Sequence, residues 1–265
     1  MINHDQHDML RRFGGVERLY GKSALNQFKK AHVIVIGIGG VGSWAVEALA
    51  RNAIGKITLI DMDVVAESNI NRQLPAMTST LGRNKIDVMA DRIREINPVC
   101  DIQLIDDFLS QENINELIDD SADFIIDCID SSKVKAALIA WCKRNKRKII
   151  TLGGAGGQTD PSLIKTADLS NTIHDPLLSK TRKILRQKYG FSNNSKRRFS
   201  IPCVFSPEHL KYAMPNGEMS NHKPSASQTN DLSCAGGIGS SVMVTASFAF
   251  IAVSYVLEKL AELNK

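Results

Sequence analysis

Short apolar runs alternate along the chain with stretches whose apolar residues recur at helical spacing. The runs predict strands and the stretches predict helices, because buried parallel strands are continuously apolar and helices repeat every three to four residues. The expected strands are 33–36, 57–60, 101–105, 124–127 and 148–152, and the expected helices are 21–30, 84–96, 111–118 and 134–145. This order predicts an α/β fold with a Rossmann-like, doubly wound and mainly parallel sheet.

The composition changes after residue 152. A run of glycines at 153–157 is expected to act as a flexible hinge, and further strands are expected at 162–166 and 199–205. Residues 215–231 are polar and rich in Pro, Ser and Asn, which is typical of a mobile loop. We therefore expect three parts: a core at 1–170, a basic and mobile segment at 171–231, and a long C-terminal helix within 232–265 that packs on the core.

An uncharged stretch from 232 to 257 near the end of the chain allows two interpretations. About 20 apolar residues suffice for a helix to cross a bilayer, so a membrane span is one of them. Gly and Ser residues dilute the stretch, however, and no second span accompanies it. These features favour the other interpretation, a core helix of the α/β domain.

Composition narrows the class of protein. The chain has 265 residues, of which 43% are hydrophobic, enough for one large domain with a buried core. Its five cysteines include no C-x-x-C pair, so neither a disulfide framework nor a structural zinc site is expected. The polar N-terminus lacks the apolar segment of a signal peptide, and a cytoplasmic location fits these features best.

The first expected strand leads into a glycine-rich loop, Gly37-Ile38-Gly39-Gly40-Val41-Gly42, and then into a helix-patterned stretch. Glycines let the backbone turn tightly and approach a phosphate, whose charge is favoured at a helix N-terminus. The second strand ends at Asp61, where a carboxylate can hydrogen-bond ribose hydroxyls. Together these features predict a bound adenosine nucleotide without saying which one.

Three further polar clusters should meet at the same crevice as the glycine loop; they are 69–73, 82–85 and 127–130. An enzyme that splits ATP between its α- and β-phosphates needs cations there, and Arg72 and Lys85 suit that task. Asp130 could hold Mg²⁺ against the phosphates. Singly, each could also be an ordinary surface residue. An NAD-dependent oxidoreductase is the alternative from another class, but it would leave all three without a task.

A second chemical feature is a basic tract between Asp175 and Glu208. Eight basic residues occur there without one acid: Lys180, Arg182, Lys183, Arg186, Lys188, Lys196, Arg197 and Arg198. Clustered positive charge predicts contact with a polyanion, although a solvated surface tract has the same composition. Tyr189 and Phe191 lie between the basic clusters, and aromatic side chains often stack on unpaired RNA bases.

The motifs GIGGVG, LIDMD, SNINRQ, the G-x-x-K of 82–85 and DCIDSSKVK together resemble the adenylation domain of ubiquitin-activating-enzyme-like proteins. The resemblance implies that 1–170 is an ATP-binding adenylation core, with Asp61 on the ribose, Lys85 on phosphates and Asp130 on Mg²⁺. The implied nucleotide-binding residues are Gly37, Gly39, Gly40, Gly42, Asp61, Asp63, Asn69, Arg72, Gln73 and Lys85. It also implies a homodimer in which an N-terminal arginine, Arg12 or Arg18, reaches the partner's ATP.

Two features distinguish the branches of that family. The zinc-binding C-x-x-C pairs of many sulfur-carrier adenylyltransferases are missing, and the basic tract is present. With RFGGVERLYG and RRFSIPCVFSPE, the chain is most similar to the branch that uses ATP to cyclise threonylcarbamoyladenosine beside the tRNA anticodon. One alternative is an adenylyltransferase for a ubiquitin-like sulfur carrier, with that carrier or a sulfur-transfer protein as its partner. Another is a non-catalytic, nucleotide-gated RNA-binding module.

Cys234 follows the predicted mobile loop and allows two interpretations. Family members use a cysteine for thioesters or sulfur chemistry, so Cys234 could capture the acyl group as a covalent catalyst. Intramolecular attack on an acyl-adenylate requires no thioester, however, and the alternative is a small residue at the start of a buried helix. The remaining cysteines, Cys100, Cys128, Cys142 and Cys203, are expected to pack in the core.

Overall fold

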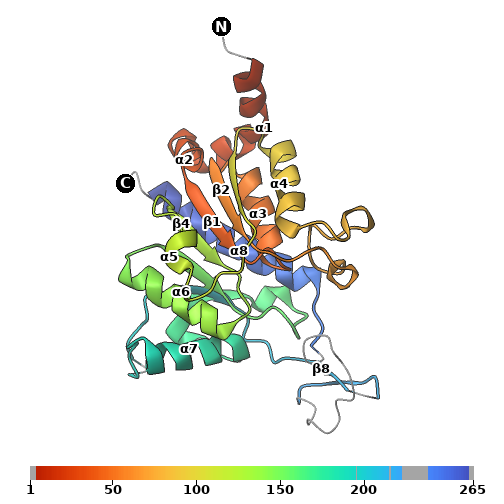
Figure 1. The fold of residues 1–265 in the computed structure, drawn as a ribbon, viewed down its shortest axis with the longest axis vertical. Coiled ribbons are helices and arrows are strands. Elements are labelled where there is room, and N and C mark those ends of the chain that lie inside the picture. Colours follow the sequence, from red (N-terminus) through yellow and green to blue (C-terminus); the bar gives the residue numbers. More distant parts are fainter. Residues whose placement is uncertain (1–3, 195, 215, 223–237, 263–265) are drawn as a thin grey trace.

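A seven-stranded sheet runs through the centre of the molecule (Figure 1). The structure is a computed structural model that describes residues 4–194, 196–214, 216–222 and 238–262. The strand order is β3-β2-β1-β4-β5-β7-β6, and neighbouring strands are parallel except β7 and β6. The strands are β1 (His32–Ile36), β2 (Lys56–Ile60), β3 (Asp101–Ile105), β4 (Phe124–Asp127), β5 (Ile149–Leu152), β6 (Lys165–Asp168) and β7 (Pro202–Phe205). The predicted doubly wound, mainly parallel fold is confirmed.

Helices cover both faces of the sheet. They are α1 (His4–Tyr20), α2 (Lys22–Phe28), α3 (Gly42–Arg51), α4 (Lys85–Ile96), α5 (Ile114–Leu117), α6 (Ser132–Arg144), α7 (Pro176–Lys188) and α8 (Val242–Ala261). In β1, Val33 and Val35 face the core formed with α2, α3, α4 and α8, whereas Ile34 and Ile36 face the core formed with α6 and α7. Both faces of the strand are buried, which explains its unbroken apolar sequence.

The C-terminal helix α8 packs in the core, against α2 and α3. Its buried face includes Val244, Phe248, Ala252 and Val256, which recur every four residues. By length and composition alone α8 could also cross a membrane, but half of its apolar window is buried inside the protein. The core position agrees with the favoured interpretation of the uncharged stretch.

The chain differs from the expected pattern in several places. The expected helix 111–118 is reduced to Ile114–Leu117, and the expected strand 162–166 starts only at Lys165, after a 3-10 turn at Pro161–Leu163. The polar N-terminus forms α1, whose Met9 and Phe13 pack with Leu25 of α2. The glycine run expected to be a hinge is instead tied on two sides, since Gly154 N–H donates to the Asp175 carboxylate at 2.9 Å and Gly157 N–H to a backbone carbonyl at 2.7 Å. The division at residue 170 stays a prediction, although β7, which follows it in sequence, lies inside the central sheet.

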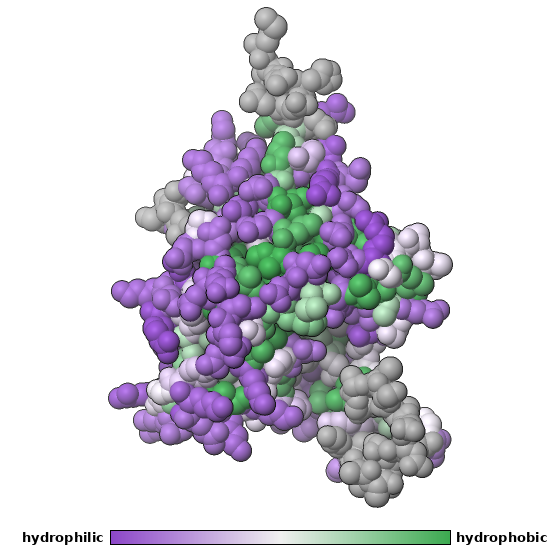
Figure 2. All heavy atoms as spheres, viewed as in Figure 1, coloured by the Kyte–Doolittle hydropathy of each residue, from purple (hydrophilic) through white to green (hydrophobic). Residues whose placement is uncertain are grey.

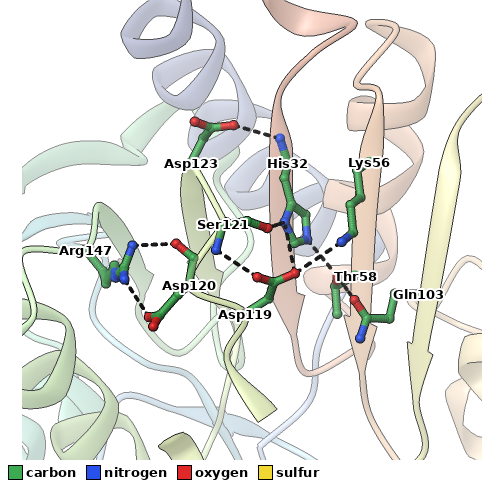
Figure 3. Close-up of polar contacts among 9 residues, drawn as sticks. All are labelled: His32, Lys56, Thr58, Gln103, Asp119, Asp120, Ser121, Asp123 and Arg147. Carbon is green, nitrogen blue, oxygen red and sulfur yellow. Dashed lines mark hydrogen bonds and ion pairs between the residues drawn. The ribbon is translucent and has the colours of Figure 1, made fainter. Parts of the chain in front are cut away.

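A polar cluster lies at the amino ends of β1 and β4 (Figure 3). The glycine loop lies at the other end of these strands, their carboxyl end. The buried ring of His32 has Nε2 at 2.8 Å from Thr58 Oγ1 and Nδ1 at 3.2 Å from Ser121 Oγ. Lys56 Nζ lies 3.1 Å from an Asp119 carboxylate oxygen in the same cluster. Burial, followed by the charge of Lys56, lowers the pKa of His32. Burial therefore disfavours the charged form of His32, and the cluster is remote from the nucleotide motifs.

Candidate active site

The loop between β1 and α3 lies where the strand order reverses, since β1 has β2 on one side and β4 on the other. Ligands of open α/β sheets bind in the crevice at this point. Two glycines of the loop have no room for a side chain. Gly37 has a φ of 85°, and a Cβ on Gly42 would lie 1.9 Å from the Gly37 carbonyl oxygen. Glycine is therefore required to bring the start of α3 to the crevice.

Asp61 directly follows β2 and ties the glycine loop to the sheet. Its carboxylate accepts hydrogen bonds from the backbone N–H groups of Ile38 at 2.6 Å and Asp63 at 2.7 Å. The residue is 6% exposed, and burial raises the pKa of its carboxyl while the two hydrogen bonds oppose the rise. The predicted contact between Asp61 and ribose stays a prediction.

Lys85 begins α4 and forms an ion pair with Asp63, with 2.7 Å between Nζ and the carboxylate oxygen. The Lys85 side chain is 6% exposed and that of Asp63 is 51% exposed, so the pair lies at the surface of the crevice. The Lys85 N–H also donates to the Asp63 carbonyl at 3.0 Å. Because an ammonium group has three donors, Lys85 can keep this partner and still bind a phosphate oxygen.

Arg72 and Gln73 come from the loop between β2 and α4. The stem of Arg72 passes over Gly40, where a Cβ would lie 3.3 Å from Arg72 Cγ, and its Nη1 donates to the Ser68 carbonyl at 2.8 Å. Gln73 is 7% exposed, and its Oε1 has no hydrogen-bond partner among the described residues. An unsatisfied buried carbonyl is costly, so Gln73 is suited to accept a hydrogen bond from a ligand.

One cleft of about 930 Å³ brings these groups together. The predicted nucleotide and catalytic residues that line it are Gly37, Gly39, Gly40, Asp61, Asp63, Asn69, Arg72, Gln73, Lys85 and Asp130. Gly42 of the same loop faces the Gly37 carbonyl and is absent from the cleft lining, and Cys234 lies outside the described residues. No group of three or more His, Cys, Asp or Glu side chains in the described ranges could hold a metal ion.

The cleft continues beyond the nucleotide motifs to the first turns of α7, which sequence motifs did not reveal. Asp175 caps α7 by accepting hydrogen bonds at 2.9 Å from the N–H groups of Leu178 and Gly154. A Cβ on Gly153 would lie 2.0 Å from this carboxylate, so only glycine fits beside it. Burial raises the pKa of Asp175. The signal available in the sequence was Asp175-Pro176, because an Asp followed by Pro often begins a helix.

A buried ion pair beneath the cleft was also missed. Lys135 of α6 and Asp127 of β4 are fully buried, with 2.8 Å between Nζ and the carboxylate oxygen. Thr151 of β5 donates to the same carboxylate at 2.6 Å and lies 3.2 Å from Lys135 Nζ. These contacts tie the carboxyl ends of β4 and β5 to the start of α6.

The basic tract divides between α7 and the loop that follows it. Arg182 and Arg186 are half-buried and have structural partners, since Arg182 donates to Thr172 Oγ1 and Arg186 to the Ser192 carbonyl. The exposed members are Lys180, Lys183, Lys188, Lys196, Arg197 and Arg198. Among these, Lys180 lines the cleft. The tract is therefore a mixture of packing residues, surface cations and one residue of the cleft.

The two aromatic residues between the basic clusters, Tyr189 and Phe191, pack against the core. Phe191 and Phe199 meet edge to face with ring centroids 4.9 Å apart, and Tyr189 packs against the same core. Both Tyr189 and Phe191 are half-buried. This packing gives both side chains a structural role, and the predicted stacking on RNA bases stays a prediction.

The N-terminal arginines lie away from the cleft of their own chain. Arg12 Nη1 donates to the carbonyls of Glu95 and Ile96, at the end of α4, at 2.8 and 3.2 Å. Neither Arg12 nor Arg18 is among the described residues that line the cleft. A role at ATP would require the cleft of a second copy.

The described cysteines pack in or against the core, as expected. Cys142 and Cys203 are buried, and Cys100 and Cys128 are half-buried. Burial raises the pKa of Cys128, which lines the cleft, to about 12. Its thiol therefore stays protonated at neutral pH and is a poor nucleophile.

Comparison with known families identifies the class of protein that has this arrangement. The ThiF family model matches residues 14–264, nearly the whole chain. The chain belongs to the ThiF family. This membership confirms the resemblance to ubiquitin-activating-enzyme-like adenylation proteins.

The similarity to individual relatives differs between the two predicted branches of the family, the tRNA-modifying enzymes and the sulfur-carrier adenylyltransferases. The chain is 53% identical over 250 residues to the tRNA threonylcarbamoyladenosine dehydratase of Haemophilus influenzae, covering 94% of this chain and 93% of that protein. The solved structure of the E. coli tRNA N6-threonylcarbamoyladenosine dehydratase with ATP has a TM-score of 0.85 at 45% identity, covering 99% of this chain and 97% of that one. A molybdopterin-synthase adenylyltransferase of Salmonella typhimurium is 32% identical over 151 residues, only 57% of each chain.

Proposed function

We propose that this protein uses ATP to dehydrate, and thereby cyclise, threonylcarbamoyladenosine next to the anticodon of tRNA. The observation that carries the proposal is the match over 94% of the chain, at 53% identity, to a dehydratase with that substrate in its name. The E. coli relative has been solved with ATP and with AMP, in agreement with an adenylating enzyme. The sulfur-carrier alternative is less well supported, because the molybdopterin-synthase relative matches only 57% of the chain.

The proposed reaction removes one water from the threonylcarbamoyl group in two steps. A carboxylate oxygen attacks the α-phosphorus of ATP, the bond to the β-phosphate oxygen breaks, and pyrophosphate leaves. The carbamoyl group then attacks the acyl carbon of the acyl-adenylate and loses a proton, and AMP leaves with the former carboxylate oxygen. Because ring closure is intramolecular, holding the nucleotide in position supplies much of the acceleration.

In this proposal the nucleotide end of the cleft neutralises the charge of the triphosphate. The glycine loop and the start of α3 offer backbone N–H groups to a phosphate. The guanidinium of Arg72 is anchored through one nitrogen to the Ser68 carbonyl, which leaves other N–H groups for phosphate oxygens. Lys85 adds a second cation at the same end. Asp61 would bind the ribose and Gln73 would accept a hydrogen bond from the nucleotide.

Magnesium is part of the proposal. Mg²⁺ bound with a nucleotide commonly uses one or two carboxylates together with phosphate oxygens and water. Asp130 fits that role, because its exposed side chain lines the cleft and forms no ion pair or hydrogen bond with the described residues. When bound, the ion would neutralise charge on the phosphates.

The exposed cations of the basic tract are proposed to bind tRNA. Lys183 and Lys188 project from α7, and Lys196, Arg197 and Arg198 follow on the next loop. These surface cations can contact RNA phosphates outside the cleft. A cytoplasmic location, where tRNA is available, belongs to the same proposal.

A homodimer is the proposed assembly. The loop between β2 and α4 carries five large, exposed apolar side chains, which are Met62, Val64, Ile70, Met77 and Leu81. Figure 2 shows apolar surface at the right edge of the view, the side on which this loop projects in Figure 1. Apolar patches of this kind often mark protein interfaces. A partner could also supply Arg12 or Arg18 to the cleft. Light scattering should return twice the chain mass of 29.1 kDa, and a single chain mass at micromolar concentration would contradict the proposal.

The function is tested with ATP, Mg²⁺ and tRNA that carries threonylcarbamoyladenosine. Mass spectrometry of the nucleosides should show the loss of one water from the modified nucleoside, with one AMP and one pyrophosphate formed for each ring. Formation of ADP, or pyrophosphate release that depends on a carrier protein and not on the tRNA, would contradict the proposal. Binding of ATP and tRNA without any turnover would support the RNA-binding module instead.

A further inference from the structure

The end of the cleft formed by α7 differs in chemistry from the end formed by the nucleotide motifs. Three cations line the cleft within the described residues, and Arg72 and Lys85 both belong to the nucleotide end. Lys180 is the third, and it projects from the second turn of α7. Leu177 of α7, Leu210 and Ile238 supply an apolar wall of the same cleft, and Leu210 and Ile238 both lie beside Gly157. The α7 end thus combines one positive charge with apolar surface.

The charge of Lys180 is not neutralised by its neighbours. Of the acids that line the cleft, Asp175 is the nearest in sequence, and its two carboxylate oxygens accept hydrogen bonds from the backbone of Gly154 and Leu178. Lys180 forms no ion pair or side-chain hydrogen bond with the described residues. Arg182, on the same helix, donates to Thr172 and so already has a structural partner. Lys180 is therefore a solvated cation at the mouth of a cleft, suited to bind an anion.

We infer that the α7 end of the cleft is the acceptor subsite and that Lys180 binds the carboxylate of the threonylcarbamoyl group. The inference rests on the proposed function, in which this carboxylate must approach the triphosphate although both are anions. A cation on the acceptor side offsets part of that repulsion and distinguishes the modified nucleotide from plain adenosine. The apolar wall of Leu177, Leu210 and Ile238 suits the adenine ring and the threonine methyl group.

The subsite makes a different prediction from a general tRNA-binding role. Binding is measured for two tRNAs, one with threonylcarbamoyladenosine and one with plain adenosine at the same position, in the presence of an ATP analogue that cannot release pyrophosphate. The wild-type protein should prefer the modified tRNA by about 10-fold, the scale of one charge-assisted hydrogen bond. Lys180→Ala should lose this preference and retain the affinity for unmodified tRNA.

Lys183→Ala is the matched control, because Lys183 is an exposed lysine one turn along α7 that does not line the cleft. It should weaken the binding of both tRNAs equally and keep the preference. Lys180→Arg, which retains the charge, should recover part of the preference. A melting curve of each variant checks that the fold is intact.

Cyclisation at saturating tRNA provides the second readout. Lys180→Ala should slow product formation by about 10- to 100-fold, whereas Lys183→Ala should affect mainly the tRNA concentration needed for saturation. Equal binding of both tRNAs by the wild type, or a full preference retained by Lys180→Ala, would overturn the subsite. Absence of cyclised product from the wild type would instead overturn the proposed function.

Discussion

The two ends of the cleft are built in different ways. At the nucleotide end, single carboxylates tie short segments together at the end of β2. Asp61 holds the glycine loop through a backbone N–H group, and Asp63 holds the start of α4 through Lys85. At the other end, a whole helix is docked and capped, with the Asp175 carboxylate occupying the space beside Gly153. The comparison teaches that a nucleotide site can be encoded in local motifs, whereas an acceptor site depends on tertiary packing.

The strongest test of this comparison removes the buried charge beneath both ends. Lys135→Met should lower the free energy of unfolding by about 3–5 kcal/mol, because it leaves Asp127 charged and buried without its partner. Urea denaturation measures the change. Lys133→Met is the control, since Lys133 lies on the same helix but is exposed. Equal stability of the two variants would show that the cleft does not depend on this ion pair.

A second test asks whether ATP cleavage depends on the nucleotide end of the cleft while tRNA binding does not. Arg72→Ala should reduce pyrophosphate release by about 10²-fold or more, the scale of losing one donor that stabilises developing charge. The affinity for tRNA should stay nearly unchanged, because Arg72 belongs to the nucleotide end. Arg83→Ala is the control, since Arg83 pairs with Asp91 and does not line the cleft. Near-normal release by the Arg72 variant would remove it from the reaction.

A third test addresses the surface beyond the α7 end. Replacing Lys196, Arg197 and Arg198 with Ala should flatten the dependence of log affinity for tRNA on log salt by roughly 2, at about 0.7–0.9 for each lost phosphate contact. ATP affinity should not change. Fluorescence titrations over a range of salt concentrations measure both. An unaltered slope would mean that these cations are only solvated surface.

The smallest effect on stability is expected from His32, at the amino end of β1, which belongs to neither end of the cleft. Burial lowers the folded-state pKa of His32 below its ordinary 6.5. Between the folded-state pKa and 6.5, the unfolded state therefore binds more protons than the folded state. The stability from neutral His32 is complete above about pH 6.5 and is lost as pH falls through the folded-state pKa. His32→Gln should remove this part of the pH dependence in urea denaturation. The same slope in the variant would assign it to other groups.

Much of the nucleotide end could be predicted from sequence because its signals are local. The apolar strands, the glycine loop and the polar residues at strand ends occur in one continuous order, and the sheet places them together. Lys135 was missed because a lysine is ordinarily assigned to the surface, and only the structure shows Asp127 opposite it. The helix α7 was missed because its many basic residues drew attention away from the helical spacing of its buried residues, Leu178, Thr181 and Leu185.

The position of β7 constrains how a tRNA can reach the cleft. The chain passes from β6 through α7 to β7, and β7 is inserted between β5 and β6. Because α7 also buries Leu178 and Leu185 against the core, it is a fixed wall and not a swinging arm. In the proposed reaction the modified nucleotide would then leave the anticodon-loop stack to enter the cleft, at an unstacking cost of a few kcal/mol.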